Sequence, residues 1–279
     1  MKKIALIYLK GGLGNQIFQI SFANYLSNLG LNVFISLSNF KISKTIKNPG
    51  VDLRELIFPV TIFNMKTLPH FFFLIFKIVI KLTKNLLITT HTDSNFRKNK
   101  IGFVNFFDGH WQNPSILIEN KDFILDSISK NRIIKNKLIS PINPGSTVLH
   151  VRRGDYLKLN EELKESFYFN AIKAGKEKIE NFNYTVFTDD YDWVINSNIF
   201  TDAKKIVYSS NSIDDTLETF AEMLSYENFI VGNSTFSLVP ALLSNSRNKK
   251  IFVADPWFRN TNIDIEVPDA IKILNQRLK

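Results

Sequence analysis

Short apolar runs alternate with helical patterns along most of the chain. Residues 4–9 form an apolar run that ends at a glycine turn, and residues 15–29 then place apolar side chains at helical spacing until Gly30. Residues 33–35 predict the next strand. A strand, a helix and a second strand in this order are typical of a βαβ unit, so we expect a parallel sheet.

The same alternation returns after a stretch rich in proline and glycine at residues 141–145. Further strands are predicted at 147–151, 184–187, 205–208, 228–231 and 250–253, and helices at 167–179, 214–225 and 237–243. We interpret residues 141–145 as a linker between two domains, 1–140 and 141–279. The predicted fold class is α/β, with two Rossmann-like domains facing a central cleft.

Residues 41–105 have a mostly helical pattern, with a weaker prediction near 86–90, and residues 69–82 are the most apolar part of the chain. Their unbroken apolar run is too short to span about 30 Å of hydrocarbon. Lys77, Lys81 and Lys84 recur at helical spacing. This pattern favours a buried amphipathic helix, and an interfacial helix on an anionic membrane is the alternative.

Charge is unevenly distributed along the 279 residues. Residues 1–140 hold 19 Lys and Arg against 7 Asp and Glu, a net charge of +12, whereas the remainder has a net charge of −3. A basic half suits an anionic lipid surface or an anionic substrate, or simply keeps the protein soluble. We find no aromatic-basic motif typical of nucleic-acid binding and therefore expect no nucleic-acid partner.

Two absences in the sequence narrow the class of protein. The chain has no cysteine, which excludes disulfides and thiolate metal sites and fits a reducing compartment. The apolar run at the N-terminus is short and lacks a cleavage-site pattern, so it favours a buried strand over a signal peptide. We expect a cytoplasmic protein, with peripheral attachment at the inner face of the membrane left open.

The most informative polar motif is His150-Val151-Arg152-Arg153-Gly154-Asp155, which directly follows a predicted strand. Open α/β sheets place ligand-binding groups at the carboxyl ends of their strands. Guanidinium groups bind phosphate oxygens through paired hydrogen bonds. The motif therefore indicates a diphosphate clamp, and the alternative is a structural ion-pair cluster between Arg153 and Asp155.

The glycine turn Gly11-Gly12-Leu13-Gly14-Asn15-Gln16 joins a predicted strand to a helix. Such a turn lets a ligand approach the backbone N–H groups closely, although turn geometry alone also explains the glycines. A dinucleotide-binding turn would carry a third glycine and an acidic residue about 20 residues later. Both features are missing here, which disfavours an NAD site.

Three more polar stretches require interpretation. Thr188-Asp189-Asp190 suits a guanine edge, a ribose or a helix cap, and Gly232-Asn233-Ser234-Thr235 suits a phosphate seat or a helix cap. Phe107-Asp108-Gly109-His110-Trp111-Gln112 suits a sugar ring stacked on an aromatic face, or ordinary core. We place the first two in strand-to-helix loops and the third outside them.

Taken in order, these motifs resemble the motif series of the α-1,2-fucosyltransferases of glycosyltransferase family 11, from residue 11 to residue 237. The resemblance implies a GT-B fold, GDP-β-L-fucose as donor, a galactose-terminated glycan as acceptor and no metal or other cofactor. Eukaryotic members carry an N-terminal membrane anchor, which this sequence does not show. We therefore expect a bacterial member active in surface polysaccharide or O-antigen synthesis.

The resemblance also implies roles for individual residues. Implied for catalysis are Arg152, Asp155 and His150, and for donor binding Arg152, Arg153, Asp189, Asp190, Asn233, Ser234, Thr235, Gly12, Gly14, Asn15 and Gln16. Arg152 would contact the pyrophosphate with Arg153 in support, and Asp189 and Asp190 would lie near the nucleoside. Asp155 is either a general base or a partner that holds an arginine in place.

The remaining implied roles concern the phosphates and the cleft. Ser234 and Thr235 would hydrogen-bond the phosphates in a GDP-fucose-binding domain, 141–279. The glycine turn would line the cleft from an acceptor-side domain, 1–140. The sequence departs from the family after Ser237, where residues 238–240 read Leu-Val-Pro instead of paired aromatics. This departure leaves the acceptor open.

The expected reaction is an inverting displacement at the sugar carbon. Two alternatives stay open: another metal-independent sugar-nucleotide transferase, such as one forming an α-1,6 linkage, and a non-catalytic nucleotide-binding module.

Overall fold

The computed structural model describes residues 2–36, 66–68, 70–83, 88–93, 100–139, 142–209, 213–260 and 264–275. The chain divides into two compact units, Met1–Lys130 and Asn131–Lys279. The boundary predicted after residue 140 lies inside the second unit, because α5 (Arg132–Leu138) packs against α9 (Ile213–Met223) of that unit.

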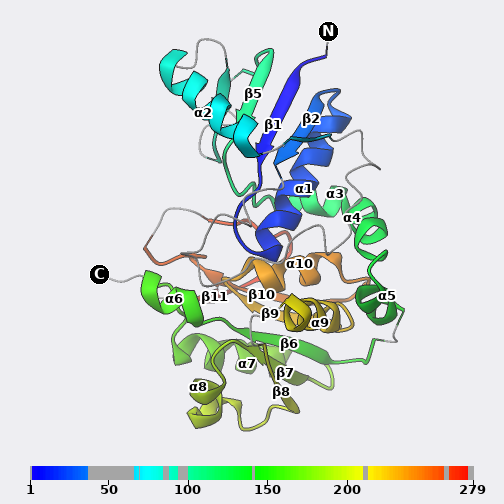
Figure 1. Cartoon of the computed structure of the whole chain (residues 1–279). Helices are drawn as coiled ribbons and strands as arrows, with labels where there is room; N and C mark the ends of the chain where they lie inside the picture. Colours follow the sequence, from blue (N-terminus) through cyan, green and yellow to red (C-terminus); the bar gives the residue numbers. More distant parts are fainter. Residues whose placement is uncertain are drawn as a thin grey trace. The chain divides into compact units, whose positions relative to one another are not determined.

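The first unit contains a five-stranded sheet in the order β3-β2-β1-β5-β4 (Figure 1). Its strands are β1 (Ile4–Tyr8), β2 (Asn32–Ser36), β3 (Lys66–Leu68), β4 (Thr89–His91) and β5 (Val104–Phe107), and its helices are α1 (Leu13–Asn28), α2 (His70–Thr83), α3 (Pro114–Glu119) and α4 (Lys121–Ile128). Every pairing is parallel. The strand order reverses between β1 and β5, and in open α/β sheets ligands bind where this reversal occurs.

The second unit contains a six-stranded parallel sheet in the order β11-β10-β9-β6-β7-β8. Its strands are β6 (Ser146–Val151), β7 (Asn183–Thr188), β8 (Lys205–Tyr208), β9 (Asn228–Gly232), β10 (Ile251–Asp255) and β11 (Ile271–Leu274). The helices besides α5 and α9 are α6 (Gly154–Leu159), α7 (Glu165–Lys178), α8 (Tyr191–Asn196), the 3₁₀ helix η2 (Asn198–Phe200) and α10 (Thr235–Leu243). Its reversal lies between β6 and β9, which is the strand order of a nucleotide-binding Rossmann sheet.

Burial explains why these segments form strands. All six residues of β6 and all five of β9 are buried, so both strands lie in the middle of the sheet. Strands buried on both faces appear in sequence as continuous apolar runs. The predicted α/β class with parallel sheets is confirmed, and each strand predicted in the second half is present.

The prediction for residues 41–105 was incomplete. Residues 37–65 lie outside the described part of the chain, but β3 lies within the region predicted to be mostly helical and β5 begins at its end. β5 was missed because its buried Asn105 interrupts the apolar run. Its amide Nδ2 donates to the carbonyls of Ile4 and Gly102, both at 3.0 Å, which makes a polar residue acceptable there.

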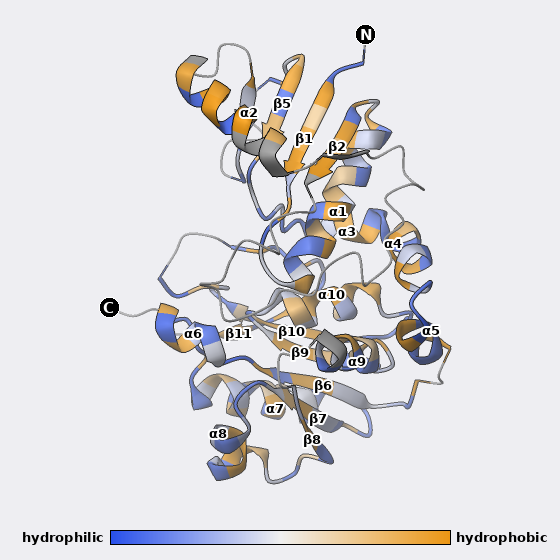
Figure 2. Cartoon of the chain, in the orientation of Figure 1, coloured by the Kyte–Doolittle hydropathy of each residue, from blue (hydrophilic) through white to orange (hydrophobic). Residues whose placement is uncertain are grey.

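Helix α2 matches the predicted helix but is only partly buried. Phe76, Val79 and Ile80 pack against the core of the first sheet. Ile78 and Leu82 face solvent, with exposed fractions of 57% and 76%, and Figure 2 shows the strongly apolar character of the helix. No helix in the described ranges is both long and apolar enough to cross a membrane.

Candidate active site

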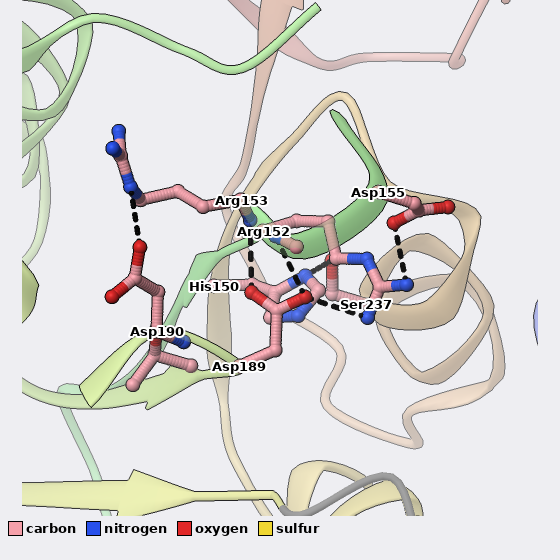
Figure 3. Close-up of polar contacts among 9 residues, drawn as sticks. His150, Arg152, Arg153, Asp155, Asp189, Asp190 and Ser237 are labelled. Atoms are coloured by element: carbon pink, nitrogen blue, oxygen red, sulfur yellow. Dashed lines mark hydrogen bonds and ion pairs between the residues drawn. The ribbon is translucent and has the colours of Figure 1, made fainter. Parts of the chain in front are cut away.

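Arg152 lies directly after β6 and is held by two carboxylates (Figure 3). Its Nη2 lies 2.7 Å from Asp155 Oδ1, and its Nη1 lies 2.9 Å from Asp189 Oδ2. A guanidinium carries five N–H donors, so the two ion pairs leave donors for an anionic ligand. The pairs fix the orientation of the group at the carboxyl end of a central strand.

Arg153 extends in a different direction from Arg152 (Figure 3). Its Nε lies 2.9 Å from Asp190 Oδ2, and its guanidinium lies 4.2 Å from the ring centroid of Trp193. Asp190 also caps α8, because its Oδ1 accepts from Trp193 N at 3.2 Å. The alternative interpretation of this motif named an ion pair between Arg153 and Asp155, but Asp155 pairs with Arg152 instead.

Asp189 shapes the turn that carries both arginines. Its carboxylate is nearly buried and accepts from Arg153 N at 2.8 Å and Gly154 N at 3.2 Å, in addition to Arg152. A Cβ at position 154 would lie 2.7 Å from Asp189 Oδ2, so a larger residue there would displace this carboxylate. Asp189 and Asp190 thus act on the arginines, and their closeness to a nucleoside stays a prediction.

Two hydrogen bonds tie the end of β6 and the start of α6 to the β9–α10 turn, across the reversal of strand order. His150 Nδ1 and Ser237 Oγ lie 2.9 Å apart, and Tyr156 OH donates to the Asn233 carbonyl at 3.0 Å. Burial, aided by the charge of Arg152, lowers the pKa of His150 to about 3, so the ring is neutral near pH 7. Burial raises the pKa of Tyr156, which keeps its hydroxyl protonated.

The N-terminus of α10 has the features of an anion seat. Ser234 is its N-cap residue, yet its side chain makes no capping hydrogen bond. The hydroxyl of Ser237 bonds to the carbonyls of Val231 and Ser234, at 3.1 and 3.2 Å, and holds the turn from inside. The first N–H groups of a helix without a cap attract anions. The side chain of Asn233 has a structural role, since its Nδ2 donates a hydrogen bond to Glu161 O at 2.8 Å.

In the first unit, glutamine side chains hold the glycine turn. Gln19 Oε1 accepts from Lys10 N at 2.8 Å, and its Nε2 donates to Lys10 O at 2.7 Å. Gln16 Nε2 donates to Gly11 O at 2.9 Å. A Cβ at Gly12 would meet nothing within 4 Å, so the space beside the backbone there is open. Gln19 was missing from the predicted site residues.

The glycine turn and the β5–α3 loop meet where the first sheet reverses its order. Lys10 Nζ lies 2.9 Å from Asp108 Oδ1, and Gln112 Nε2 donates to Asn15 Oδ1 at 2.7 Å. We had placed residues 107–112 outside the strand-to-helix loops, which is wrong because β5 ends at Phe107 and α3 begins at Pro114. This error hid Lys10 and Asp108 as candidate site residues.

The family model for glycosyl transferase family 11 matches residues 2–272. The chain belongs to glycosyl transferase family 11. It is 28% identical over 284 residues to an α-1,2-colitosyltransferase of Escherichia coli, with 94% of each chain covered. It is also 25% identical to the O-antigen biosynthesis glycosyltransferase WbnK of Escherichia coli, covering 91% of this chain and 95% of the relative.

Solved structures of glycosyltransferases are similar to this family 11 chain as well. A mutant of Arabidopsis thaliana FUT1 in complex with GDP has a TM-score of 0.48 at 12% identity, covering 91% of this chain and 70% of that one. Escherichia coli ADP-heptose lps heptosyltransferase II has a TM-score of 0.46 at 10% identity, covering 98% and 90%.

Membership of family 11 makes the chain a glycosyltransferase. The resemblance inferred from the motifs is thereby confirmed at the level of the family. Within the described residues, no group of three or more His, Asp or Glu side chains is arranged to hold a metal ion.

Proposed function

We propose that this glycosyltransferase moves L-fucose from GDP-β-L-fucose to the 2-hydroxyl of a galactose-terminated glycan, in an α-1,2 linkage, during bacterial surface polysaccharide synthesis. The observation that carries the proposal is Arg152, which two carboxylates fix at the carboxyl end of β6. The uncapped start of α10, tied to β6 through His150 and Ser237, supports a pyrophosphate at the same edge.

The proposed chemistry is a single displacement with inversion at the anomeric carbon. The bond from C1 to the acceptor oxygen forms while the bond from C1 to the β-phosphate oxygen breaks, and the electron pair leaves with GDP. Arg152 and the N–H groups at the start of α10 stabilise the charge that develops on the phosphate. We propose that they do so without a divalent cation.

Asp155 is better suited to positioning than to proton transfer. Its Oδ1 is engaged by Arg152 Nη2 at 2.7 Å. We assign Asp155 the holding of Arg152, which was one of its two predicted roles. His150, neutral and bonded to Ser237, is assigned the positioning of α10.

A second sugar is a candidate for the group that is transferred. The relative that is 28% identical is named for α-1,2 transfer of colitose, a deoxy form of fucose. This name supports the α-1,2 linkage over α-1,6 and makes GDP-colitose the second candidate donor.

The proposal is tested by incubating the enzyme with each donor and a panel of β-galactosides, then determining the new linkage by NMR. We expect an α-1,2-fucosylated product, and a matched reaction with Arg152→Ala serves as the control. Transfer from GDP-colitose alone would reassign the donor. A different linkage, or donor hydrolysis without transfer, would contradict the proposal.

We also propose that the enzyme works at the inner face of the membrane, with α2 resting on anionic lipid. Phe72, Ile75, Ile78 and Leu82 are exposed apolar residues of this helix, and the exposed Lys81 lies beside them. The net charge of +12 over residues 1–140 complements an anionic surface.

A further inference from the structure

Helix α6 sets the position of Asp155, the partner of Arg152, but apolar packing does little to hold this helix. None of its six residues is fully buried. Asp155 Oδ1 nevertheless lies 2.7 Å from Arg152 Nη2, so the direction of the guanidinium depends on where α6 lies (Figure 3). The contacts that fix α6 within the second unit therefore also help to fix Arg152.

The end of α6 is tied to the segment that follows β10. Asn160, the C-cap residue of α6, has a left-handed backbone with a φ of +53°. Its carbonyl accepts from Arg259 Nη2 at 2.7 Å and from Asn260 Nδ2 at 3.0 Å. Arg259 Nη2 also donates to the Glu162 carbonyl at 2.8 Å. The guanidinium thus bonds to the chain on both sides of Glu161.

Glu161 joins the same two segments in the opposite direction. Its two carboxylate oxygens accept from Arg259 N at 2.7 Å and from Asn260 N at 2.8 Å. Glu161 and Arg259 are each only 5% exposed. We call these contacts between residues 160–162 and 259–260 the Glu161–Arg259 lock. Loss of one buried partner leaves the other without a hydrogen bond, which costs more than losing an exposed contact.

The lock continues into the turn before α10. The carbonyl of Glu161 accepts from Asn233 Nδ2 at 2.8 Å, and the carbonyl of Asn233 accepts from Tyr156 OH at 3.0 Å. Phe258 packs edge-on against Tyr156, with a centroid distance of 6.3 Å. These contacts join the segments that follow β6, β9 and β10 into one network. The network borders the edge of the sheet at which Arg152 and the start of α10 lie.

Two buried charges are an inefficient way to stabilise a fold, because each loses its hydration. We propose that Glu161 and Arg259 are instead positioning residues for the donor site. The lock sets the place of α6, and Asp155 on α6 then sets the direction of Arg152. The inference rests on the proposed function, in which Arg152 binds the diphosphate of the donor.

The first test compares Glu161→Gln with the wild-type enzyme. Glutamine has a similar shape, but its NH2 group cannot accept from a backbone N–H. We expect kcat to fall by about tenfold or more, with a smaller loss of GDP affinity, because a displaced Arg152 loses most contact in the transition state. Circular dichroism gives the folded fraction to which kcat is referred.

Glu227→Gln is the matched control. Glu227 precedes β9, so it lies at the opposite edge of the same sheet, and its Oε2 accepts from Gly145 N at 2.6 Å. The same chemical change there also weakens the hold on a backbone N–H. The variant should lose stability but keep the wild-type kcat and GDP affinity.

The second test asks whether the lock acts through Arg152. Calorimetry measures GDP affinity in four proteins: the wild type, Glu161→Gln, Arg152→Ala and the double variant. Glu161→Gln should weaken GDP binding in the wild-type background and have almost no further effect once Arg152 is absent. A purely structural role would weaken binding by the same factor in both backgrounds, and that result would overturn the inference.

Asn260→Ala covers the case in which Glu161→Gln does not fold. Asn260 is exposed, and the substitution removes only its side-chain bonds to the carbonyls of Leu159 and Asn160. We expect kcat to fall by about threefold, the effect of one hydrogen bond. If Glu161→Gln is unfolded and Asn260→Ala has the kcat of the wild type, the inference is wrong.

The outcomes separate this inference from the proposed function. Normal kcat for folded Glu161→Gln, alongside an inactive Arg152→Ala enzyme, overturns the role of the lock and leaves the donor site standing. Normal turnover of Arg152→Ala overturns the donor site itself.

Discussion

Arg152 is expected to contribute mainly to the transition state. In comparable sites, loss of one donor to a developing oxyanion costs about 2.7–4 kcal/mol, so Arg152→Ala should lose about 100-fold or more in turnover. Circular dichroism checks that the variant is folded. Arg247→Ala, which removes an exposed guanidinium from the same unit, should keep normal turnover. Near-normal turnover of folded Arg152→Ala would rule out the assignment of Arg152 to a diphosphate clamp.

His150 gives the folded state a specific dependence on pH. Its pKa is lowered to about 3 in the native protein, so between pH 6.5 and about 3 the unfolded chain binds a proton that the native state excludes. Stability is therefore lost as the pH falls through this range. Between pH 7 and 5 the linkage amounts to about 2 kcal/mol of unfolding free energy.

Urea unfolding at these two pH values tests this linkage in the wild-type protein and in His150→Asn. The variant should lose about 2 kcal/mol less than the wild type over the same change, although it starts less stable because the bond to Ser237 is gone. His91 and His110 titrate in both proteins and cancel in the comparison. Equal losses would show that His150 is not held neutral.

For single residues, the sequence predicted which side chains belong to the site better than it predicted their ion-pair partners. Arg152, Asp155 and Asp189 were all expected, but the ion pair considered as an alternative joined Arg153 to Asp155, whereas Arg153 pairs with Asp190. Several carboxylates were equally plausible partners, and the choice depends on the directions in which two strands end. Neither Lys10 nor Asp108 was assigned to the site, because β5 was not predicted.

Helix α10 allows two roles of its N-cap residue, Ser234, to be distinguished: binding a ligand and capping the helix. Replacing a capping serine by alanine ordinarily costs about 1 kcal/mol. Ser234 makes no such bond, so Ser234→Ala should leave the unfolding free energy nearly unchanged while weakening GDP binding in calorimetry. Asn131→Ala is the matched control, because Asn131 caps α5 by accepting from Ile133 N at 2.9 Å.

That control should show the reverse pattern, with lower stability and normal GDP affinity. A destabilised Ser234→Ala protein with normal affinity would argue against the anion seat.

Helix α2 is predicted to bind anionic lipid through its exposed apolar residues. Ile78→Gln combined with Leu82→Gln should weaken binding to vesicles containing phosphatidylglycerol by about tenfold or more, since each buried apolar side chain contributes about 1.5–3 kcal/mol. Sedimentation with vesicles measures the effect, and turnover on a water-soluble acceptor should not change. Phe169→Gln, equally exposed but on α7, is the control. If the wild-type enzyme does not bind these vesicles, the proposed contact between α2 and lipid is wrong.

The predictability of the elements followed the strength of their burial pattern. β6 and β9 are buried throughout and were predicted readily. β11 was missed, because its four residues alternate between buried and exposed positions at the edge of its sheet. A short edge strand provides little apolar signal in the sequence.

The two units share an arrangement. In each, the strand order of the parallel sheet reverses beside the first strand of that sheet. Two side-chain contacts then join the chain segments at or after the ends of the two strands at the reversal. In the first unit the bonds are Lys10–Asp108 and Asn15–Gln112, and in the second His150–Ser237 and Tyr156–Asn233. The alternation of strands and helices in the sequence predicted the second sheet apart from β11, but only β1 and β2 of the first sheet. It could not predict the side-chain contacts, which join residues distant in the chain.

If fixed donors replace a cation in the second unit, the reaction should not require one. We expect turnover in excess EDTA to match turnover in magnesium, because Arg152 and the start of α10 stabilise the leaving diphosphate. A coupled assay for released GDP, with its coupling enzymes checked separately in EDTA, measures this. Loss of activity that added metal restores would contradict the expectation.

The stacking of Arg153 on Trp193 gives the turn after β6 an optical signal of its own. The chain has three tryptophans, and Trp111 and Trp257 are enclosed in the interiors of their units. Trp193 instead lies under the guanidinium of Arg153, which Asp190 anchors. Of the three, Trp193 is therefore the one whose emission responds to a movement of Arg153.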